Sequence, residues 1–310
     1  RRRDGEPRQG PEAARAGRIK PGDRLLFCDL EFPSNAYPWM SLARDGVESL
    51  IVPAERGGLT LAAVERHAGE HLRAVAVSAV QFFTGHRTDL AAIGQFCRQR
   101  GILFIVDAIQ AIGHMPIDVA AMGIDVLATG GMKSLLGLPG VGFLYVRDAV
   151  AATMQPRLIH SNATVDYIHW LAYDLTLQPG AARFMAGTPN VAGIIGLGPS
   201  LALLEELGVA HIDAHTTDLS RYACQQLTAL GLDVITPGEA LGPIVTFRSP
   251  VDATATEAIV QQLAAERVIV TKHLDAAGAA YIRLSVHAYN VREEIDRFVA
   301  VYRRLAARPA

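Results

Sequence analysis

The chain has 310 residues, of which 50% are apolar and 19% are charged, and its formal net charge is −2. A chain of this length can bury most of the surface that its unfolded form exposes, so it needs no disulfide or structural metal to fold. The composition excludes collagen-like and disordered proteins, and the near-zero charge gives no electrostatic reason to expect a nucleic-acid partner.

The apolar runs and the cysteines narrow the class further. The longest apolar runs are far shorter than the roughly 20 residues that cross a bilayer, so we expect no membrane association. Cys28, Cys97 and Cys224 are widely spaced and odd in number, which argues against a disulfide framework or a zinc cluster. His67 and His71 are four residues apart but lack a third ligand, so we expect no metal site. A reduced, cytoplasmic setting is the expectation.

Residues 1–20 begin RRRDGEPRQG and have no apolar run after the basic start, which argues against a signal peptide. We expect this stretch to be a poorly ordered arm or the truncated end of a longer chain.

Short apolar runs follow, most of them bounded by Gly, Pro or Asp, and such runs are typical of buried strands. We expect strands at 25–30, 49–52, 74–80, 102–106, 126–129 and 141–146. Helical patterns lie between several of them, at 38–44, 61–67, 89–100 and 118–122. This alternation predicts a large, mostly parallel sheet with helices on both faces.

The pattern changes after about residue 190. Helices are expected at 191–207, 211–230, 255–266 and 291–306, with strands at 232–235, 243–247, 268–270 and 281–286. Few strands with intervening helices predict a smaller α+β domain. The expected organisation is an arm or truncated end at 1–20, a large domain at 21–205 and a small domain at 206–310.

Ligands of open parallel sheets bind beyond the carboxyl ends of the strands, and two residues stand out there. Asp107 directly follows an apolar run and reads either as a helix N-cap or as a functional carboxylate. Lys133 follows another strand, in a chain that has only two further lysines, Lys20 and Lys272. A partly buried lysine can lose its proton whereas arginine cannot, so Lys133 is either a Schiff-base nucleophile or a surface or phosphate-contacting lysine.

Considered together, Asp107 and Lys133 suggest a pyridoxal 5'-phosphate (PLP) site. At the ends of two strands of one sheet, a carboxylate keeps the pyridine nitrogen of PLP protonated, and a lysine carries the aldehyde as an imine.

Five segments in order resemble the class V aminotransferase family of fold type I PLP enzymes, in its cysteine desulfurase and isopenicillin-epimerase-like branch. The segments are DLEFPSNAYPW at 29–39, FIVDAIQAIGHMPIDV at 104–119, TGGMKSLLGLPGVGFLYV at 129–146, RFMAGTPN at 183–190 and YIRLSVHAYNVREEID at 281–296. The resemblance implies a fold type I architecture and PLP as cofactor.

The resemblance also implies roles for individual residues. Lys133 would form the internal aldimine and Asp107 would pair with the pyridinium nitrogen, which makes these two the catalytic residues. Gln110 would bond the phenolic oxygen of the ring, and Phe32 would lie where many members stack a histidine on the cofactor. Thr188 would reach the phosphate of a neighbouring subunit, which implies a homodimer with shared active sites.

For substrate binding, the resemblance implies Arg283, which would clamp the α-carboxylate of a small amino acid, and Asn35. For Arg283 the alternative is a strand arginine on a solvated face.

The chain also departs from the family pattern. Desulfurases carry a catalytic cysteine on the loop before the final strand. The corresponding loop here, residues 270–283 (VTKHLDAAGAAYIR), contains no cysteine. Gly130 and Met132 stand where many members have a serine and a histidine that contact the phosphate. The family's front segment, with its phosphate-binding helix start, is absent before Gly17, so we expect weak cofactor binding by this chain.

We therefore expect a PLP-dependent aminotransferase or lyase without a desulfurase cysteine. An epimerase of the isopenicillin N type stays open, because transamination, elimination and epimerisation begin with loss of the same α-proton. So does a catalytically inactive remnant that keeps the fold for dimerisation or partner binding.

Overall fold

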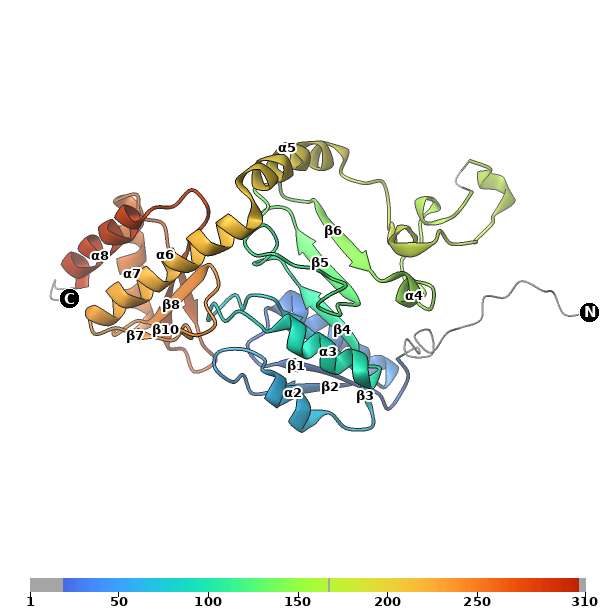
Figure 1. Cartoon of the computed structure of the whole chain (residues 1–310), viewed down its shortest axis with the longest axis horizontal. Helices are drawn as coiled ribbons and strands as arrows, with labels where there is room; N and C mark the ends of the chain where they lie inside the picture. The colour runs from blue at the N-terminus through green and yellow to red at the C-terminus, as the bar shows by residue number, and fades with distance from the viewer. Residues whose placement is uncertain (1–18, 167, 307–310) are drawn as a thin grey trace, which may run out of the picture.

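The computed structural model describes residues 19–166 and 168–306, which form two sheets with their helices (Figure 1). The larger sheet has six strands in the order β2-β1-β3-β4-β5-β6. Its strands are β1 Arg24–Cys28, β2 Glu48–Val52, β3 Leu72–Ser78, β4 Leu103–Asp107, β5 Val126–Gly130 and β6 Gly142–Val146. All neighbours pair in parallel except β5 and β6, so the predicted mostly parallel sheet is confirmed.

Helices cover both faces of this sheet. On one face, α2 (Leu61–His67) and α3 (Leu90–Arg100) bury apolar side chains against the strands. Each begins at a residue whose side chain accepts a backbone N–H, Thr60 for α2 and Asp89 for α3, which is the usual N-cap arrangement. On the other face, the short helix α1 (Tyr37–Met40) packs Trp39 against β1 and β3.

The remaining helical segments lie in the connections. They are α4 Asp148–Ala151 and the 3-10 turns η2 Pro33–Asn35, η3 Ser41–Asp45, η4 Ser161–Ala163, η5 Trp170–Ala172 and η6 Gly180–Phe184. Figure 1 shows that the segment between α4 and α5 (Val191–Leu207) extends away from the sheet.

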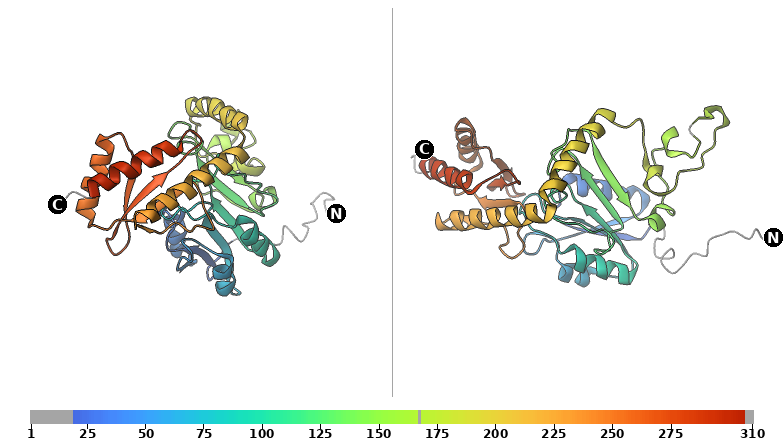
Figure 2. Two further views of the ribbon diagram at one scale, coloured as in Figure 1. Left: turned by 60° about the vertical axis from the view of Figure 1, so that its left-hand side comes forward. Right: turned by 45° about the horizontal axis from the view of Figure 1, so that its top comes forward.

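The smaller sheet is antiparallel, in the order β7-β8-β10-β9. Its elements are α6 Val209–Ala229, β7 Asp233–Val234, β8 Ile244–Arg248, α7 Ala253–Ala265, β9 Thr271–Leu274, β10 Ala280–Ser285 and α8 Arg292–Ala306. The helices α6, α7 and α8 pack with β8 and β10 around a second core. In this core the rings of Phe247 and Tyr302 meet edge to face. The last helix, red in Figure 2, lies beside α6.

Two expected elements are wrong and several boundaries move. Residues 118–122 form turns rather than a helix, because Asp118 accepts the N–H groups of Ala120 and Ala121 and a left-handed glycine, Gly123, follows. Residues 268–270 are not a strand; β9 begins at Thr271. The apolar run at 268–270 therefore precedes β9 and is not part of it.

The two sheets meet along a seam, which we define as residues 81–88 between β3 and α3 together with the residues that they contact around β8 and β10. Thr84 O accepts the hydroxyl of Thr236, and Gly85 O accepts the N–H of Gly242. Gly85 has a φ of +77°, and a Cβ there would lie 2.0 Å from Ile244 O. Only glycine allows this backbone conformation and this close approach together.

Among the described residues no single helix is long and apolar enough to cross a membrane, whereas α5 and α6, which meet at 77°, pass the same test only as a bent pair.

Candidate active site

The carboxyl ends of the parallel strands gather the predicted residues at one edge of the large sheet. Ser78 ends β3 and Asp107 ends β4, and the two are paired in the β3–β4 register. Asp107 is also paired with Ala128 of β5, the strand that leads into Lys133. Strand order and register therefore bring Asp107 and Lys133 to the same edge, as the sequence predicted.

Lys133 is half-buried in the turn after β5. Its Nζ lies 5.7 Å from the centroid of the Phe32 ring. Burial lowers the pKa of the Lys133 amine and the charge of Arg283 lowers it further, while Asp107 opposes both. A lowered pKa favours the neutral amine, which is the nucleophilic form of lysine.

The backbone next to Lys133 is anchored from two directions. The hydroxyl of Ser134 donates to Ile109 O at 3.3 Å. The carbonyl of Ser134 lies 3.0 Å from Nε2 of His287, which belongs to the small-sheet side of the molecule. The residue beside the candidate nucleophile is thus tied to both parts of the chain.

Asp107 faces a turn and not a helix, so the N-cap interpretation does not hold in its simple form. Its carboxylate accepts the N–H of Ile109 at 3.0 Å, and residues 109–114 are turns. Burial raises the pKa of the Asp107 carboxyl, whereas the bond from Ile109 and the charge of Lys133 lower it. A partly buried carboxylate that accepts only one hydrogen bond within the described structure has acceptor capacity left for a positively charged group.

Phe32 and Arg283 complete the cluster around Lys133. Phe32 is 40% exposed and meets the ring of Phe82 edge-on, with centroids 5.0 Å apart. Arg283, on β10, donates from Nη1 to Phe82 O at 2.8 Å, while its buried Nε has no partner in the described structure. Burial lowers the pKa of Arg283, and a buried unpaired donor favours an anionic ligand.

The other predicted residues lie in different surroundings. Gln110 is half-buried in the turn that follows β4. Asn35 is buried and both ends of its amide are engaged, by Glu31 at 2.9 Å and by Trp39 at 3.1 Å. Thr188 is exposed between η6 and α5. The phosphate role of Thr188 and the substrate role of Asn35 stay predictions.

Two groups of residues at this edge escaped the sequence reasoning. Glu31 accepts hydrogen bonds from Ser78 and Asn35, and the rings of His114 and His287 lie 4.4 Å apart. Glu31 directly precedes Phe32, and that adjacency was the available signal. The histidine contact joins residues far apart in sequence and gave none.

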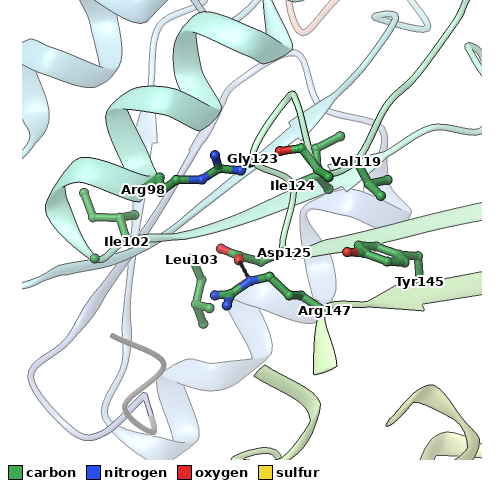
Figure 3. Close-up of a pocket in the computed structure, with 11 residues that line it drawn as sticks. Arg98, Ile102, Leu103, Val119, Gly123, Ile124, Asp125, Tyr145 and Arg147 are labelled. Atoms are coloured by element: carbon green, nitrogen blue, oxygen red, sulfur yellow. Dashed lines mark hydrogen bonds and ion pairs between the residues drawn. The ribbon is translucent and has the colours of Figure 1, made fainter. Parts of the chain in front are cut away.

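A separate cavity of about 440 Å³ lies at the opposite edge of the large sheet, where β4 and β5 begin (Figure 3). Arg147 donates from Nε to Asp125 at 2.7 Å, and Asp125 also accepts the N–H of Phe104. Arg98 donates to Ala120 O at 2.6 Å. These polar groups have partners within the protein, and none of the predicted site residues lines this cavity.

The donor set around Lys133 fits the ring and the aldehyde of PLP. Lys133 supplies an amine with a lowered pKa, Asp107 a partly buried carboxylate, and Phe32 an exposed ring beside Lys133. At the phosphate end, Gly130 and Met132 offer no side-chain hydrogen-bond donor. Among the residues that the structure describes, no group of three or more His, Cys, Asp or Glu could hold a metal ion.

The folded chain has known relatives. An uncharacterized aminotransferase of Bacillus subtilis (strain 168) is 30% identical over 271 residues, which cover 87% of this chain and 69% of that protein. A cysteine desulfurase of Escherichia coli O127:H6 is 32% identical over 298 residues, which cover 93% of this chain and 72% of that protein.

Solved structures show the same architecture. The apo structure of cysteine desulfurase from Thermococcus onnurineus NA1 has a TM-score of 0.82 at 26% identity and covers 95% of this chain and 76% of that one. A mutant of the protein C-DES, with glycine covalently linked to its PLP cofactor, has a TM-score of 0.82 at 23% identity and covers 96% and 79% of the two chains. The second likeness supports the fold alone.

The sheet order, the small antiparallel sheet and these neighbours define a PLP enzyme fold of type I. Residues 11–298 match the class V aminotransferase family, and the chain belongs to that family, whose members use PLP. The family resemblance and the fold class predicted from the sequence are therefore confirmed.

Proposed function

We propose that this chain binds PLP through Lys133 and acts on the α-carbon of a small amino acid by aminotransferase or lyase chemistry. The observation that carries the proposal is the half-buried Lys133, whose amine has a lowered pKa and faces Phe32 at the strand edge that also carries Asp107. PLP, when bound, accepts the electrons that the substrate α-carbon releases.

The residues of the chain have distinct tasks in this proposal. Asp107 stabilises the positive charge on the pyridine nitrogen, because its carboxylate is partly buried and accepts only one backbone donor, from Ile109. Lys133 anchors the aldehyde and, once released, takes and returns the proton at the substrate α-carbon. Phe32 covers the ring and, having no titratable group, moves no proton.

Arg283 is proposed to bind the substrate carboxylate. Its Nη1 is already held by Phe82 O, which fixes the plane of the guanidinium. The buried Nε and the second terminal nitrogen then present the paired donors that a carboxylate accepts in bidentate form.

A cysteine-persulfide step of the desulfurase kind finds no support among the three cysteines of the sequence. Burial raises the pKa of the Cys28 and Cys97 thiols to about 12, and that of Cys224 to about 11. A thiol attacks as thiolate, and these three remain protonated at neutral pH. This supports transamination or elimination over desulfuration, with epimerisation as the alternative outcome of the same first proton transfer.

We further propose that two copies of the chain assemble, with Thr188 contributing to the site of the neighbour. Large apolar side chains are exposed on α5, where Ile195 is 70% exposed, and on the extended segment before it, where Leu171 is 85% exposed. Exposed apolar surface of this kind marks an association site. Sedimentation of the protein at micromolar concentration tests the proposal, and a monomer there contradicts it.

The cofactor proposal is tested by adding PLP and recording the visible absorbance of the covalently bound cofactor. We expect the band in the parent chain and its loss in Lys133→Ala. Lys272→Ala is the matched control, because Lys272 pairs with Glu257 and lies on β9. If the band persists in Lys133→Ala and disappears in Lys272→Ala, PLP is attached to Lys272, and the proposal is wrong.

A further inference from the structure

A partly buried carboxylate directly before Phe32 has no part in the function proposed above. Glu31 lies on the connection that follows β1, and its two oxygens receive hydrogen bonds from three residues. Oε1 accepts the N–H of Ser78 at 2.9 Å and faces the Cys28 thiol at 3.9 Å. Oε2 accepts the Ser78 hydroxyl at 2.5 Å and the Asn35 amide at 2.9 Å.

These contacts fix the backbone around Phe32. Asn35 N donates to Phe32 O at 2.7 Å, so the backbone turns between Phe32 and Asn35. The side chain of Asn35 then returns to Glu31, and its Oδ1 accepts the indole N–H of Trp39 at 3.1 Å. Hydrogen bonds thus fix the backbone on both sides of Phe32, and Glu31 accepts the bond that closes this turn through the Asn35 amide.

The same carboxylate ties this turn to the strand edge that carries Asp107. Ser78 gives Glu31 both its backbone N–H and its hydroxyl, and it is the register partner of Asp107. Burial raises the pKa of the Glu31 carboxyl, so the carboxylate is expensive to bury and is retained through its donors. An apolar residue would fill the same space without that cost, which indicates that the bonds themselves matter.

We propose that Glu31 is a positioning residue that holds the ring of Phe32 against Lys133 and thereby keeps the lysine amine desolvated. The inference rests on the proposed function in one respect: Lys133 is taken as the reacting amine. Glu31 itself touches neither substrate nor cofactor in this arrangement.

The sign of the effect follows from two opposing contributions. A ring near an ammonium stabilises the charged form, which on its own raises a lysine pKa. The same ring excludes water, which lowers it, and burial is the largest influence on the pKa of Lys133. Release of Phe32 therefore moves the pKa of Lys133 upward.

The small number of lysines makes this measurable without cofactor. The protein, free of PLP, is labelled with trace acetic anhydride across a range of pH, and peptides carrying Lys20, Lys133 and Lys272 are quantified by mass spectrometry. In Glu31→Gln we expect the labelling midpoint of Lys133 to move upward, while the other two lysines serve as internal references. The glutamine keeps the size, but in either orientation its NH2 group faces a donor, the Ser78 N–H or the Asn35 amide, where the carboxylate has an acceptor.

Glu48→Gln is the matched control, because Glu48 is an exposed carboxylate on β2 that pairs with Arg24. It should leave the Lys133 midpoint where it is. An unchanged midpoint in a folded Glu31→Gln overturns the inference, and so does an equal shift of all three lysines, which would mean general loosening.

Ser78→Ala decides the matter if Glu31→Gln does not fold. It removes only the hydroxyl donor to Oε2 and leaves the backbone bond to Oε1. We expect the labelling midpoint of Lys133 to move upward by a smaller amount than in Glu31→Gln. An unchanged midpoint in Ser78→Ala would overturn the inference. Because the labelling needs no PLP, a failure of Lys133 to bind the cofactor is a separate result from a failure of Glu31 to position Phe32.

Discussion

The two edges of the large sheet differ in how their polar groups are satisfied. At the amino edge, Asp125, Arg147 and Arg98 bond to one another or to backbone groups around the cavity of Figure 3. At the carboxyl edge, Arg283 Nε and Gln81 Oε1 are buried with no hydrogen-bond partner in the described structure. Such atoms lower stability unless a ligand pairs with them.

This difference between the two edges indicates which of them carries the functional site. The cavity of Figure 3 belongs to the edge whose polar side chains have partners within the protein, and the candidate site belongs to the edge where two buried polar atoms have none in the described structure. At the carboxyl edge burial moves the pKa values of Lys133, Asp107 and Glu31 away from their ordinary values, which is typical of functional sites.

The largest effect is expected from Arg283→Lys. Lysine keeps the charge but loses the planar pair of donors, and a lost charge-assisted pair in a buried site costs about 2–4 kcal/mol, or roughly 30- to 1000-fold in kcat/KM. PLP absorbance should remain, because Arg283 is assigned to the substrate. Steady-state kinetics with a panel of small amino acids measures the change. Unchanged kinetics would assign the carboxylate to another group, and loss of bound cofactor would mark Arg283 as structural.

A smaller, pH-dependent effect is expected at the contact of His114 with His287. Burial, with the neighbouring His287, lowers the pKa of His114 to about 3, against about 6.5 when unfolded. The unfolded chain therefore binds this proton first as the pH falls. The stability from this group is complete above pH 6.5 and declines below it by about 1.4 kcal/mol per pH unit, until the native pKa is reached.

His114→Phe keeps a ring against His287 and removes the titration. Urea unfolding at pH 7 and pH 4.5 should show about 2.5 kcal/mol less acid loss in the variant than in the parent chain. His71→Gln, at an exposed histidine, is the control and should behave as the parent. If all three proteins lose the same unfolding free energy between pH 7 and pH 4.5, His114 is not the group responsible.

The smallest effect is expected from Arg147→Ala at the amino edge. Arg147 is partly exposed and its partner Asp125 keeps the bond from Phe104 N, so the loss should be about 1 kcal/mol of unfolding free energy. The labelling midpoint of Lys133 and the PLP absorbance should not change. A change in either would show that the two edges are coupled and would remove the contrast between them.

Much of the fold was predictable because buried strands in parallel sheets are continuous apolar runs. The elements around Asp107 and Lys133 needed only the rule that ligands lie beyond the carboxyl ends of strands. The turn at 118–122 was mistaken for a helix because the Asp118 side chain bonds its own backbone, which competes with helix formation.

The site was predictable only in part, because the residues that hold Lys133, Phe32 and Arg283 in place are far from them in sequence. Glu31 meets Ser78 over 47 residues, and His287 meets Ser134 over 153. No periodicity or local spacing encodes such pairs. Arg283 could be named from its motif, but its bond to Phe82 O, which fixes its orientation, follows from how the two sheets join.

The seam between the sheets limits how this enzyme fold can close on a ligand. The Gly85 backbone approaches Ile244 so closely that no side chain would fit between them, and Arg87 donates to Asp213 of α6 from both terminal nitrogens, at 2.7 and 2.9 Å. Phe82, which contacts both Phe32 and Arg283, belongs to the same short stretch. A hinge at this point would pull the aromatic contact and the arginine out of place together. We therefore expect enclosure of a substrate to come from side-chain rotation or from the exposed segments outside the seam, rather than from rotation of one sheet against the other.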